Sequence, residues 1–389
     1  MKYRVLIVDD SVVMRRIVRQ SLEGDSEIEV AGVAANGNIA LAMVEQNTLD
    51  AITLDIEMPE MDGLQTLREL RARGVRTPVI MFSTLTERGA LATLDALAAG
   101  ADDYVAKPSN VGNVQESMLR IRLELIPKIK ALCWKIKPNR TPPPVTIPSA
   151  RVAPASASPA VVAIPRPPAV HRIDVVAIGT STGGPNALAE VIAKLPSDFP
   201  VPIVIVQHMP PTFTRFLADR LTAGSSLLVR EAIPSGVLQP GQVWIAPGDF
   251  HMSLYRQESS VNIRTFQAPP ENSCRPSVDV LFRSVAEVFA HNTLAVVMTG
   301  MGQDGLRGCE HIKEAGGQII VQDEATSIVW GMPGYVAKAG LADSVLPLCD
   351  IAGDIVRRVN RGPRTSCTSA SSATGLASRL IARGGDYGA

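Results

Sequence analysis

The sequence predicts an α/β protein of two doubly wound parallel-sheet domains joined by a proline-rich linker. Three observations lead to this prediction. Apolar strands alternate with amphipathic stretches over residues 1–125, the same alternation resumes over 173–360, and residues 126–172 between them are rich in proline. The end of the chain, 361–389, is rich in Ser, Thr, Ala and Gly, and we expect a disordered tail there. A chain of 389 residues is long enough for two such domains.

Composition excludes several classes of protein. The two predicted domains carry net charges of −6 and −4, so neither is suited to binding a nucleic-acid backbone, while residues 126–170 carry +7. No apolar run is long enough to span a membrane, and acidic residues follow the N-terminus too soon for a signal peptide. The five cysteines are widely spaced and form no C-x-x-C pair, so neither a disulfide framework nor a zinc cluster is indicated. We therefore expect a cytoplasmic protein that is not embedded in a membrane.

In the first domain, chemistry-bearing residues follow the ends of the predicted strands. The predicted strands lie at 3–8, 28–33, 51–54, 78–82 and 103–106, and the predicted helices near 12–23, 37–47, 63–73, 88–99 and 112–126. Because parallel strands end at one edge of a sheet, the residues after them should meet in one crevice. These residues are Asp9, Asp10, Asp55, Ser83 and Lys107.

Three clustered carboxylates suit a hard cation such as Mg²⁺, because they would otherwise repel one another. With Mg²⁺ and Lys107 to stabilise charge, Asp55 could accept a phosphoryl group as a nucleophile. The alternative for Asp9 and Asp10 alone is that they only cap the following helix. The agreement of five positions favours the phosphorylation site.

In the second domain, a glycine-rich turn follows the first predicted strand. The predicted strands lie at 173–179, 201–207, 242–248, 293–300 and 317–323, with helices between them. The turn contains Ser181 in the pattern G-x-S-x-G, and Pro185 suits the first turn of a helix. A dinucleotide site is the competing interpretation, but the chain lacks G-x-G-x-x-G and ends the next strand with Gln207 and His208 rather than an acid. The turn therefore favours an exposed nucleophilic serine.

His208 and Asp304 follow two later strands and should lie at the same edge as Ser181. A serine needs a base to become nucleophilic, and the base needs a carboxylate that orients it, so the three residues supply a catalytic triad. The backbone amides of Met301 and Thr182 are candidates to bind an oxyanion. The remaining histidines are expected to be surface or capping residues, with His251 possible at the rim of the site.

The motifs of the first 125 residues resemble those of the receiver domain of two-component response regulators. They are VLIVDDSVVMRRIV, LDIEMPEMDGL, PVIMFSTLT and GADDYVAKP. The resemblance implies a flavodoxin-like fold and a kinase that donates the phosphoryl group. It also implies specific roles: Mg²⁺ acids (Asp9, Asp10 and Asp55), a Mg²⁺-binding main-chain carbonyl (Glu57), the phospho-acceptor (Asp55), a switch hydroxyl and aromatic (Ser83, Tyr104) and a phosphate-contacting lysine (Lys107).

The second domain resembles the catalytic domain of the CheB-type chemotaxis protein-glutamate methylesterases. The shared stretches are GTSTGGPNAL, VQHMPPTFT, WIAPGDFHM, RPSVDVLF, VVMTGMGQDG and QDEATSIVWGMP, over roughly 173–360. The resemblance implies a Rossmann-like fold, Ser181 as nucleophile, His208 as base and Asp304 as orienting acid, with no cofactor for the esterase reaction. It further implies hydrolysis of glutamate γ-methyl esters on methyl-accepting chemotaxis receptors, and deamidation of specific receptor glutamines.

A receiver joined to a hydrolase by a tether suggests that phosphorylation of Asp55 relieves a block of the catalytic edge. The alternative is a receiver-controlled binding protein or phosphate sink, whose hydrolase-like half no longer turns over. A DNA-binding output is disfavoured by the acidic second half and the lack of a compact basic helix-turn-helix segment.

Overall fold

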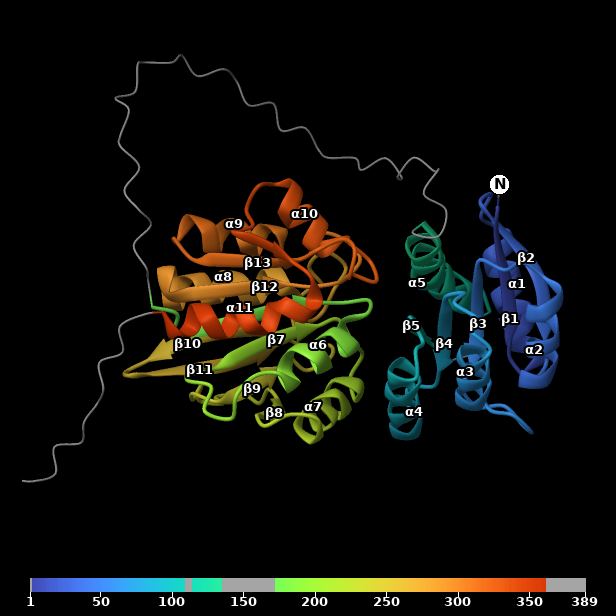
Figure 1. Ribbon diagram of the computed structural model, residues 1–389, viewed down its shortest axis with the longest axis horizontal. Helices are drawn as coiled ribbons and strands as arrows, with labels where there is room; N and C mark the ends of the chain where they lie inside the picture. Colours follow the sequence, from blue (N-terminus) through green and yellow to red (C-terminus); the bar gives the residue numbers. More distant parts are fainter. Residues whose placement is uncertain (1, 109–113, 135–171, 362–389) are drawn as a thin grey trace, which may run out of the picture.

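The computed structural model describes residues 2–108, 114–134 and 172–361. It contains two α/β domains, and Figure 1 shows them side by side with α4 and α5 of the first on the side that faces the second. In the first domain the strands are β1 (Tyr3–Val8), β2 (Ile28–Ala34), β3 (Ala51–Asp55), β4 (Val79–Ser83) and β5 (Asp103–Ala106). The helices are α1 (Val12–Glu23), α2 (Gly37–Gln46), α3 (Gly63–Ala72), α4 (Glu87–Ala98) and α5 (Val114–Trp134).

The first sheet is parallel throughout, in the order β2-β1-β3-β4-β5, which confirms the predicted doubly wound fold. All residues of β3 and β4 are buried, as expected for strands covered on both faces. Helices α1 and α5 pack on one face, and α2, α3 and α4 pack on the other. Local signals set the helix starts: the Ser11 side chain accepts from the Met14 amide, and Asp62 and Gln65 form a capping box.

The linker begins later than the sequence predicts. Helix α5 continues to Trp134 through Pro127, so the predicted start of the linker at residue 126 is wrong. Three side chains of the extension, Ile129, Leu132 and Cys133, are buried against the first domain, and this burial outweighs the hydrogen bond that a proline removes from a helix. The rest of the predicted linker, 135–171, and the predicted tail, 362–389, lie outside the described residues.

The second domain is built on a parallel sheet in the order β14-β13-β12-β6-β7-β9-β8. Its strands are β6 (Val175–Thr180), β7 (Ile203–Gln207), β8 (Leu228–Glu231), β9 (Gln242–Ile245), β12 (Thr293–Val297), β13 (Gln318–Gln322) and β14 (Ser344–Leu346). Strands β10 (His251–Gln257) and β11 (Ser260–Phe266) form a separate antiparallel hairpin. Neither this hairpin nor the short edge strands β8 and β14 were predicted from the sequence.

Helices cover both faces of this second sheet. One face carries α8 (Val278–Phe289), α9 (Leu306–Glu314) and α10 (Met332–Lys338), together with the 3₁₀ helix η1 (Ala290–Asn292) that follows α8. The other carries α6 (Gly184–Ala193), α7 (Phe213–Ala223) and α11 (Leu348–Asn360). The apolar core under α6 and α7 continues into the first domain through α4 and β5, so the two domains share one buried cluster.

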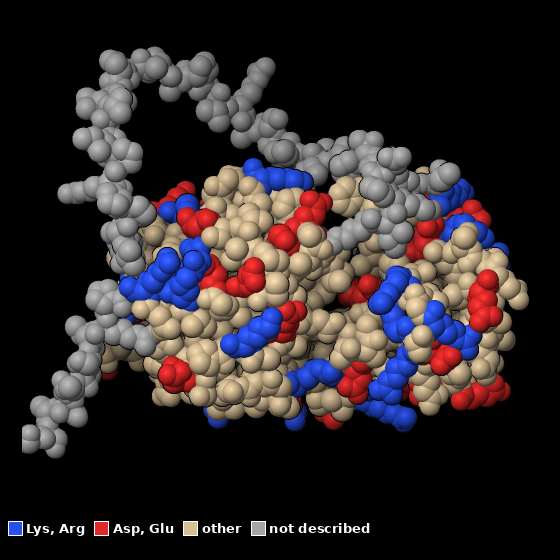
Figure 2. Space-filling model, viewed as in Figure 1, with Lys and Arg blue, Asp and Glu red and all other residues tan. Residues whose placement is uncertain are grey.

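Charged side chains are mixed on the surface (Figure 2), and the helices of the described residues are not of the membrane-spanning kind. On the face that Figure 2 shows, basic and acidic side chains of the described residues are interspersed over both domains. None of the helices in 2–108, 114–134 and 172–361 combines the length and the hydropathy that a membrane span needs.

Candidate functional sites

The predicted phosphorylation site assembles at the carboxyl edge of the first sheet. The Lys107 Nζ lies 2.7 Å from Asp55 Oδ2 and 3.1 Å from Asp9 Oδ2. The Asp55 side chain is almost fully buried. Burial, and secondarily the charge of Asp9, raise the pKa of Asp55 to about 6, although Lys107 opposes the shift.

Carboxylate oxygens of Asp9, Asp10 and Asp55 lie within 4.8 Å of one another. This all-oxygen set fits Mg²⁺, which would offset the repulsion between Asp9 and Asp55 and keep the acceptor ionised. The structure places these three predicted ligands together. For the fourth predicted ligand, the Glu57 main chain, the backbone amide donates to Asp55 Oδ1 over 3.2 Å.

The two predicted switch residues point away from the acceptor. The Ser83 hydroxyl donates to the Gly89 carbonyl over 3.0 Å and accepts from Thr93 over 2.7 Å, both on α4. The Tyr104 ring stacks on Phe213 of α7, with centroids 5.2 Å apart and planes 12° from parallel. Tyr104 therefore lies in the interface between the domains.

The predicted triad follows three adjacent strands of the second sheet. Ser181 follows β6, His208 follows β7 and Asp304 follows β12, and β6 lies between the other two strands. Two glycines shape the turn at Ser181. Gly183 has φ +77°, which a side chain disfavours, and a Cβ on Gly300 would lie 2.9 Å from the Ser181 Cβ.

His208, which is partly buried, forms a hydrogen-bonded pair with the buried Asp304. The Nε2 of His208 lies 2.8 Å from Asp304 Oδ2, and the Nδ1 faces Cys274 Sγ at 3.6 Å. Within the described residues, Ser181 makes no hydrogen bond to His208. Burial lowers the pKa of His208, but the hydrogen bond with Asp304 and the contact with Cys274 outweigh it and raise the pKa.

The donors that hold Asp304 were not predicted from the sequence. Its carboxylate accepts from Asn272 Nδ2 and Ser277 Oγ, both over 2.8 Å, and from the Val278 amide over 2.6 Å at the start of α8. Burial raises the pKa of Asp304, but His208, the Val278 amide and Ser277 outweigh it and hold the pKa at about 2. The one available signal is the stretch RPSVDVLF, which contains Ser277 and Val278 but indicates no role for either residue.

His251 is not at the rim of the site. The side chain is buried, accepts from the Ser277 amide at Nδ1 over 3.2 Å and lies 3.1 Å from the Pro269 carbonyl through Nε2. His251, the first residue of β10, therefore supports the loop that carries Ser277 through this hydrogen bond.

The two candidate oxyanion amides have no partner inside the described part of the chain. Neither the N–H of Thr182 nor that of Met301 donates to another described residue. Both residues flank the close approach between Gly300 and Ser181. Two unpaired amides beside a serine are the arrangement that an oxyanion hole requires.

The first domain covers Ser181 at the interface between the domains. Ser181 and His208 line a hollow of about 30 Å³, which has room for little more than one water. The first domain supplies part of its wall: Leu97, Asp103, Tyr104 and Lys128. The hollow beside Ser181 is therefore too small for a whole amino-acid side chain while the domains are in contact.

Polar contacts hold this closed arrangement. The Thr182 hydroxyl donates to Asp103 over 2.8 Å, and Lys128 Nζ lies 3.1 Å from the same carboxylate. Nearby, Asn186 Nδ2 donates to the Leu97 carbonyl over 2.8 Å. Lys128 belongs to the extension of α5 that the sequence predicts as linker, so this added stretch of helix contributes to the interface.

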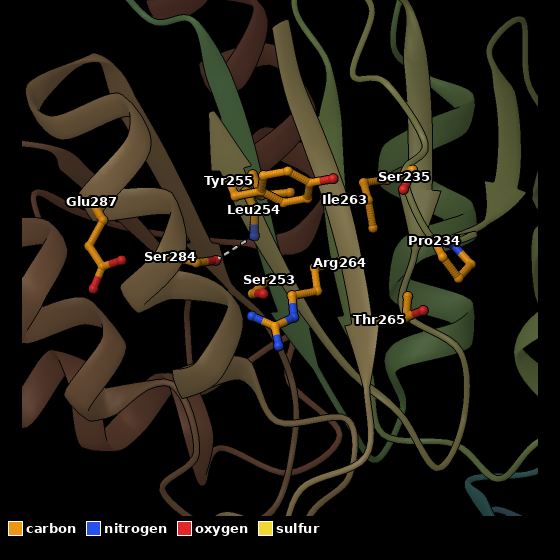
Figure 3. A pocket seen from close by; sticks show the side chains of 10 residues that line it. All are labelled: Pro234, Ser235, Ser253, Leu254, Tyr255, Ile263, Arg264, Thr265, Ser284 and Glu287. Atoms are coloured by element: carbon orange, nitrogen blue, oxygen red, sulfur yellow. Dashed lines mark hydrogen bonds between the residues drawn. The ribbon is translucent and has the colours of Figure 1, made fainter. Parts of the chain in front are cut away.

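A second hollow, of about 640 Å³, lies between the β10–β11 hairpin and α8 (Figure 3). Figure 3 shows Tyr255, Arg264 and Glu287 around it, and the Leu254 amide donating to Ser284. None of its lining residues belongs to the two predicted sites.

Fold and site together define a receiver domain attached to an α/β domain with a serine–histidine–aspartate constellation. The chain matches the response regulator receiver domain over residues 5–118 and the CheB methylesterase family over 176–355. Protein-glutamate methylesterase/protein-glutamine glutaminase of Trichodesmium erythraeum is 51% identical over 362 residues, covering 92% of this chain and 99% of the relative. The chain belongs to this family of receiver-linked CheB methylesterases.

A second relative and a solved structure are also similar to this chain. The Nocardioides protein-glutamate methylesterase/protein-glutamine glutaminase is 51% identical, covering 92% of this chain and 96% of its own. The crystal structure of the Thermotoga maritima CheB methylesterase catalytic domain is 44% identical, covering 48% of this chain and 99% of that one, with a TM-score of 0.47.

Proposed function

We propose that this protein is a phosphorylation-activated serine hydrolase that removes methyl groups from glutamate γ-methyl esters of chemotaxis receptors. It also deamidates specific receptor glutamines, because attack on an ester and on a primary amide needs the same serine, base and oxyanion site. A chemotaxis histidine kinase supplies the phosphoryl group, and the protein works in the cytoplasm. The observation that carries the proposal is that Ser181, His208 and Asp304 follow three adjacent strands, with Ser181 and His208 covered by the receiver domain.

In this proposal Ser181 attacks the ester carbonyl, and His208 takes the hydroxyl proton. The Nε2 of His208 is committed to Asp304, so the base is Nδ1. The amides of Thr182 and Met301 bind the oxyanion of the tetrahedral intermediate. His208 then returns the proton to the departing methanol or ammonia, and water releases the acyl group from Ser181.

The receiver acts as a cover that phosphorylation displaces. Asp9, Asp10, Asp55 and the Glu57 carbonyl would hold Mg²⁺, which neutralises charge during phosphoryl transfer to Asp55. Lys107 stabilises the product, and Ser83 and Tyr104 reorient toward it. Reorientation of Tyr104 removes its stacking on Phe213, which weakens the contact that closes the catalytic hollow.

The experiment uses membranes enriched in a chemotaxis receptor, carrying either labelled methyl esters or glutamines at the modified positions. With Mg²⁺ and a small-molecule phosphodonor, the protein should release methanol from the first and ammonia from the second. If neither product forms while Asp55 takes up phosphate, the chain is instead a receiver-controlled binding protein or phosphate sink.

We expect the contact between Asp103 and Thr182 to keep the unphosphorylated protein inactive. Replacing Asp103 by Ala removes the carboxylate that accepts the buried Thr182 hydroxyl, a charge-assisted bond worth roughly 1.5–3 kcal/mol. The unphosphorylated methanol-release rate should rise by about 10- to 150-fold, since each 1.4 kcal/mol corresponds to about a factor of ten. The phosphorylated rate should not change.

Asp95→Ala is the matched control, because Asp95 pairs with Arg220 across the same interface but at an exposed position. Such pairs contribute about 0–1 kcal/mol, so its unphosphorylated rate should change much less. An Asp103→Ala protein as inactive as the wild type without phosphodonor would show that this contact does not hold the cover.

A further inference from the structure

Cys274 lies against the proposed base but has no part in the proposed mechanism. Its sulfur is 3.6 Å from the Nδ1 of His208, and both side chains are partly buried. Ligand atoms of Cys274, His208 and Asp304 lie within 4.8 Å of one another. One thiol, one imidazole and one carboxylate thus meet at the catalytic centre.

These groups match the preferences of a thiophilic divalent cation. Thiolate sulfur and imidazole nitrogen are the main ligands of Zn²⁺ in proteins, at about 2.3 and 2.0–2.1 Å. Two such ligands at a tetrahedral angle are about 3.5 Å apart, close to the observed 3.6 Å between Sγ and Nδ1. The same separation suits a thiol donating to the imidazole, so the pair needs little rearrangement to accept a cation.

Asp304 orients His208 as a carboxylate next to a metal-binding histidine does. It accepts the N–H on the Nε2 of His208 over 2.8 Å, which fixes the ring and leaves Nδ1 directed at Cys274. A carboxylate on the far nitrogen of a coordinating histidine is the usual support of a zinc ligand. The donors from Asn272 and Ser277 hold that carboxylate in turn.

We propose that Cys274 and His208 form a binding site for Zn²⁺ or a similar thiophilic cation, and that the bound cation switches the esterase off. The cation bonds to Cys274 Sγ and His208 Nδ1, and waters complete its coordination. The thiol proton, and any proton on Nδ1, pass to solvent. Inhibition follows because the occupied Nδ1 is the nitrogen that would accept the proton of Ser181. This step rests on the proposed function, whereas the binding itself does not.

The site differs in kind from the acidic cluster of the first domain. Asp9, Asp10 and Asp55 offer only oxygen and suit Mg²⁺, whereas the second site offers sulfur and nitrogen.

Co²⁺ is the first probe, because thiolate ligation gives it an intense near-ultraviolet absorption that oxygen ligands do not. The full-length protein, with Mg²⁺ and a phosphodonor present, is titrated with Co²⁺ and then with Zn²⁺ as competitor. The absorption should appear and should be lost on addition of Zn²⁺. Cys274→Ser and His208→Gln should each abolish it, and Cys349→Ser, which removes an exposed cysteine, should leave it unchanged. An absorption that survives in Cys274→Ser would overturn the site.

The second readout is methanol release at increasing free Zn²⁺. Loss of the thiolate ligand should raise the zinc concentration for half-inhibition on the order of 100-fold in Cys274→Ser, with each protein's rate expressed relative to its own zinc-free rate. Equal zinc sensitivity in Cys274→Ser and wild type would refute inhibition at this site. If no protein releases methanol, the proposed esterase fails, but the cobalt absorption still decides whether the cation binds.

Discussion

The Ser181→Ala protein should release methanol at least about 10,000-fold more slowly than the wild type under phosphorylating conditions, because no other hydroxyl replaces the nucleophile. Ser181 directly follows β6 and lies close to Gly300. The unpaired amides of Thr182 and Met301 flank this close approach. The substitution removes one oxygen from a partly buried position, so the fold should be kept. Initial rates of methanol release from labelled receptor membranes give the measurement.

Two comparisons separate loss of the nucleophile from loss of structure. Phosphate uptake by Asp55 should be unchanged in Ser181→Ala, because Asp55 belongs to the other domain. Ser253→Ala is the matched control, since Ser253 lies on β10 in the second hollow. A Ser181→Ala protein within tenfold of the wild type would mean that another group attacks the ester.

The Asp304→Asn protein should lose about 10,000-fold in rate, because an amide cannot stabilise the imidazolium that forms on His208. Replacing the aspartate of a serine-protease triad by asparagine lowers the rate by about this factor. The effect should be larger here than that of any surface carboxylate, since Asp304 is buried and accepts five hydrogen bonds, from Asn272, Ser277, Val278, Asp279 and His208.

The pH profile distinguishes this role from a structural one. His208 acts as a base only when it is neutral, and Asp304 contributes to raising the pKa of His208. The wild-type rate should therefore rise with pH until His208 loses its proton, above the ordinary range of a histidine. In Asp304→Asn the low residual rate should level off at a lower pH. A profile with an unchanged midpoint would contradict the assignment of His208 and Asp304 as an acid–base pair.

Much of both sites follows from one rule about parallel sheets. Asp9, Asp55 and Lys107 are predictable because they follow strands, and strand ends meet at one edge. His208 and Asp304 are predictable in the same way, although they are 96 positions apart in the chain. The buried strands are short apolar runs bounded by glycine and polar residues, so their positions are visible in the sequence.

Features that depend on contacts between distant loops were not visible. Asn272 and Ser277 lie in a loop with no strand end to mark them, and only the fold brings them to Asp304. The end of α5 was predicted too early, because no local signal shows that a helix continues through Pro127; burial of Ile129 and Leu132 continues it. The contact between Asp103 and Thr182 depends on how the two domains pack, which local patterns do not encode.

The central claim is that phosphorylation of Asp55 uncovers Ser181, and one rate comparison tests it most directly. Methanol release from labelled receptor membranes is measured for wild type and Asp55→Ala, each with Mg²⁺ and with or without a small-molecule phosphodonor. The wild-type rate should rise on addition of the phosphodonor, by about tenfold or more if about 1.4 kcal/mol or more of interface free energy is lost, while the Asp55→Ala rate stays at the unphosphorylated level. An equal response of both proteins, or no response in either while Asp55 of the wild type is phosphorylated, would contradict the claim.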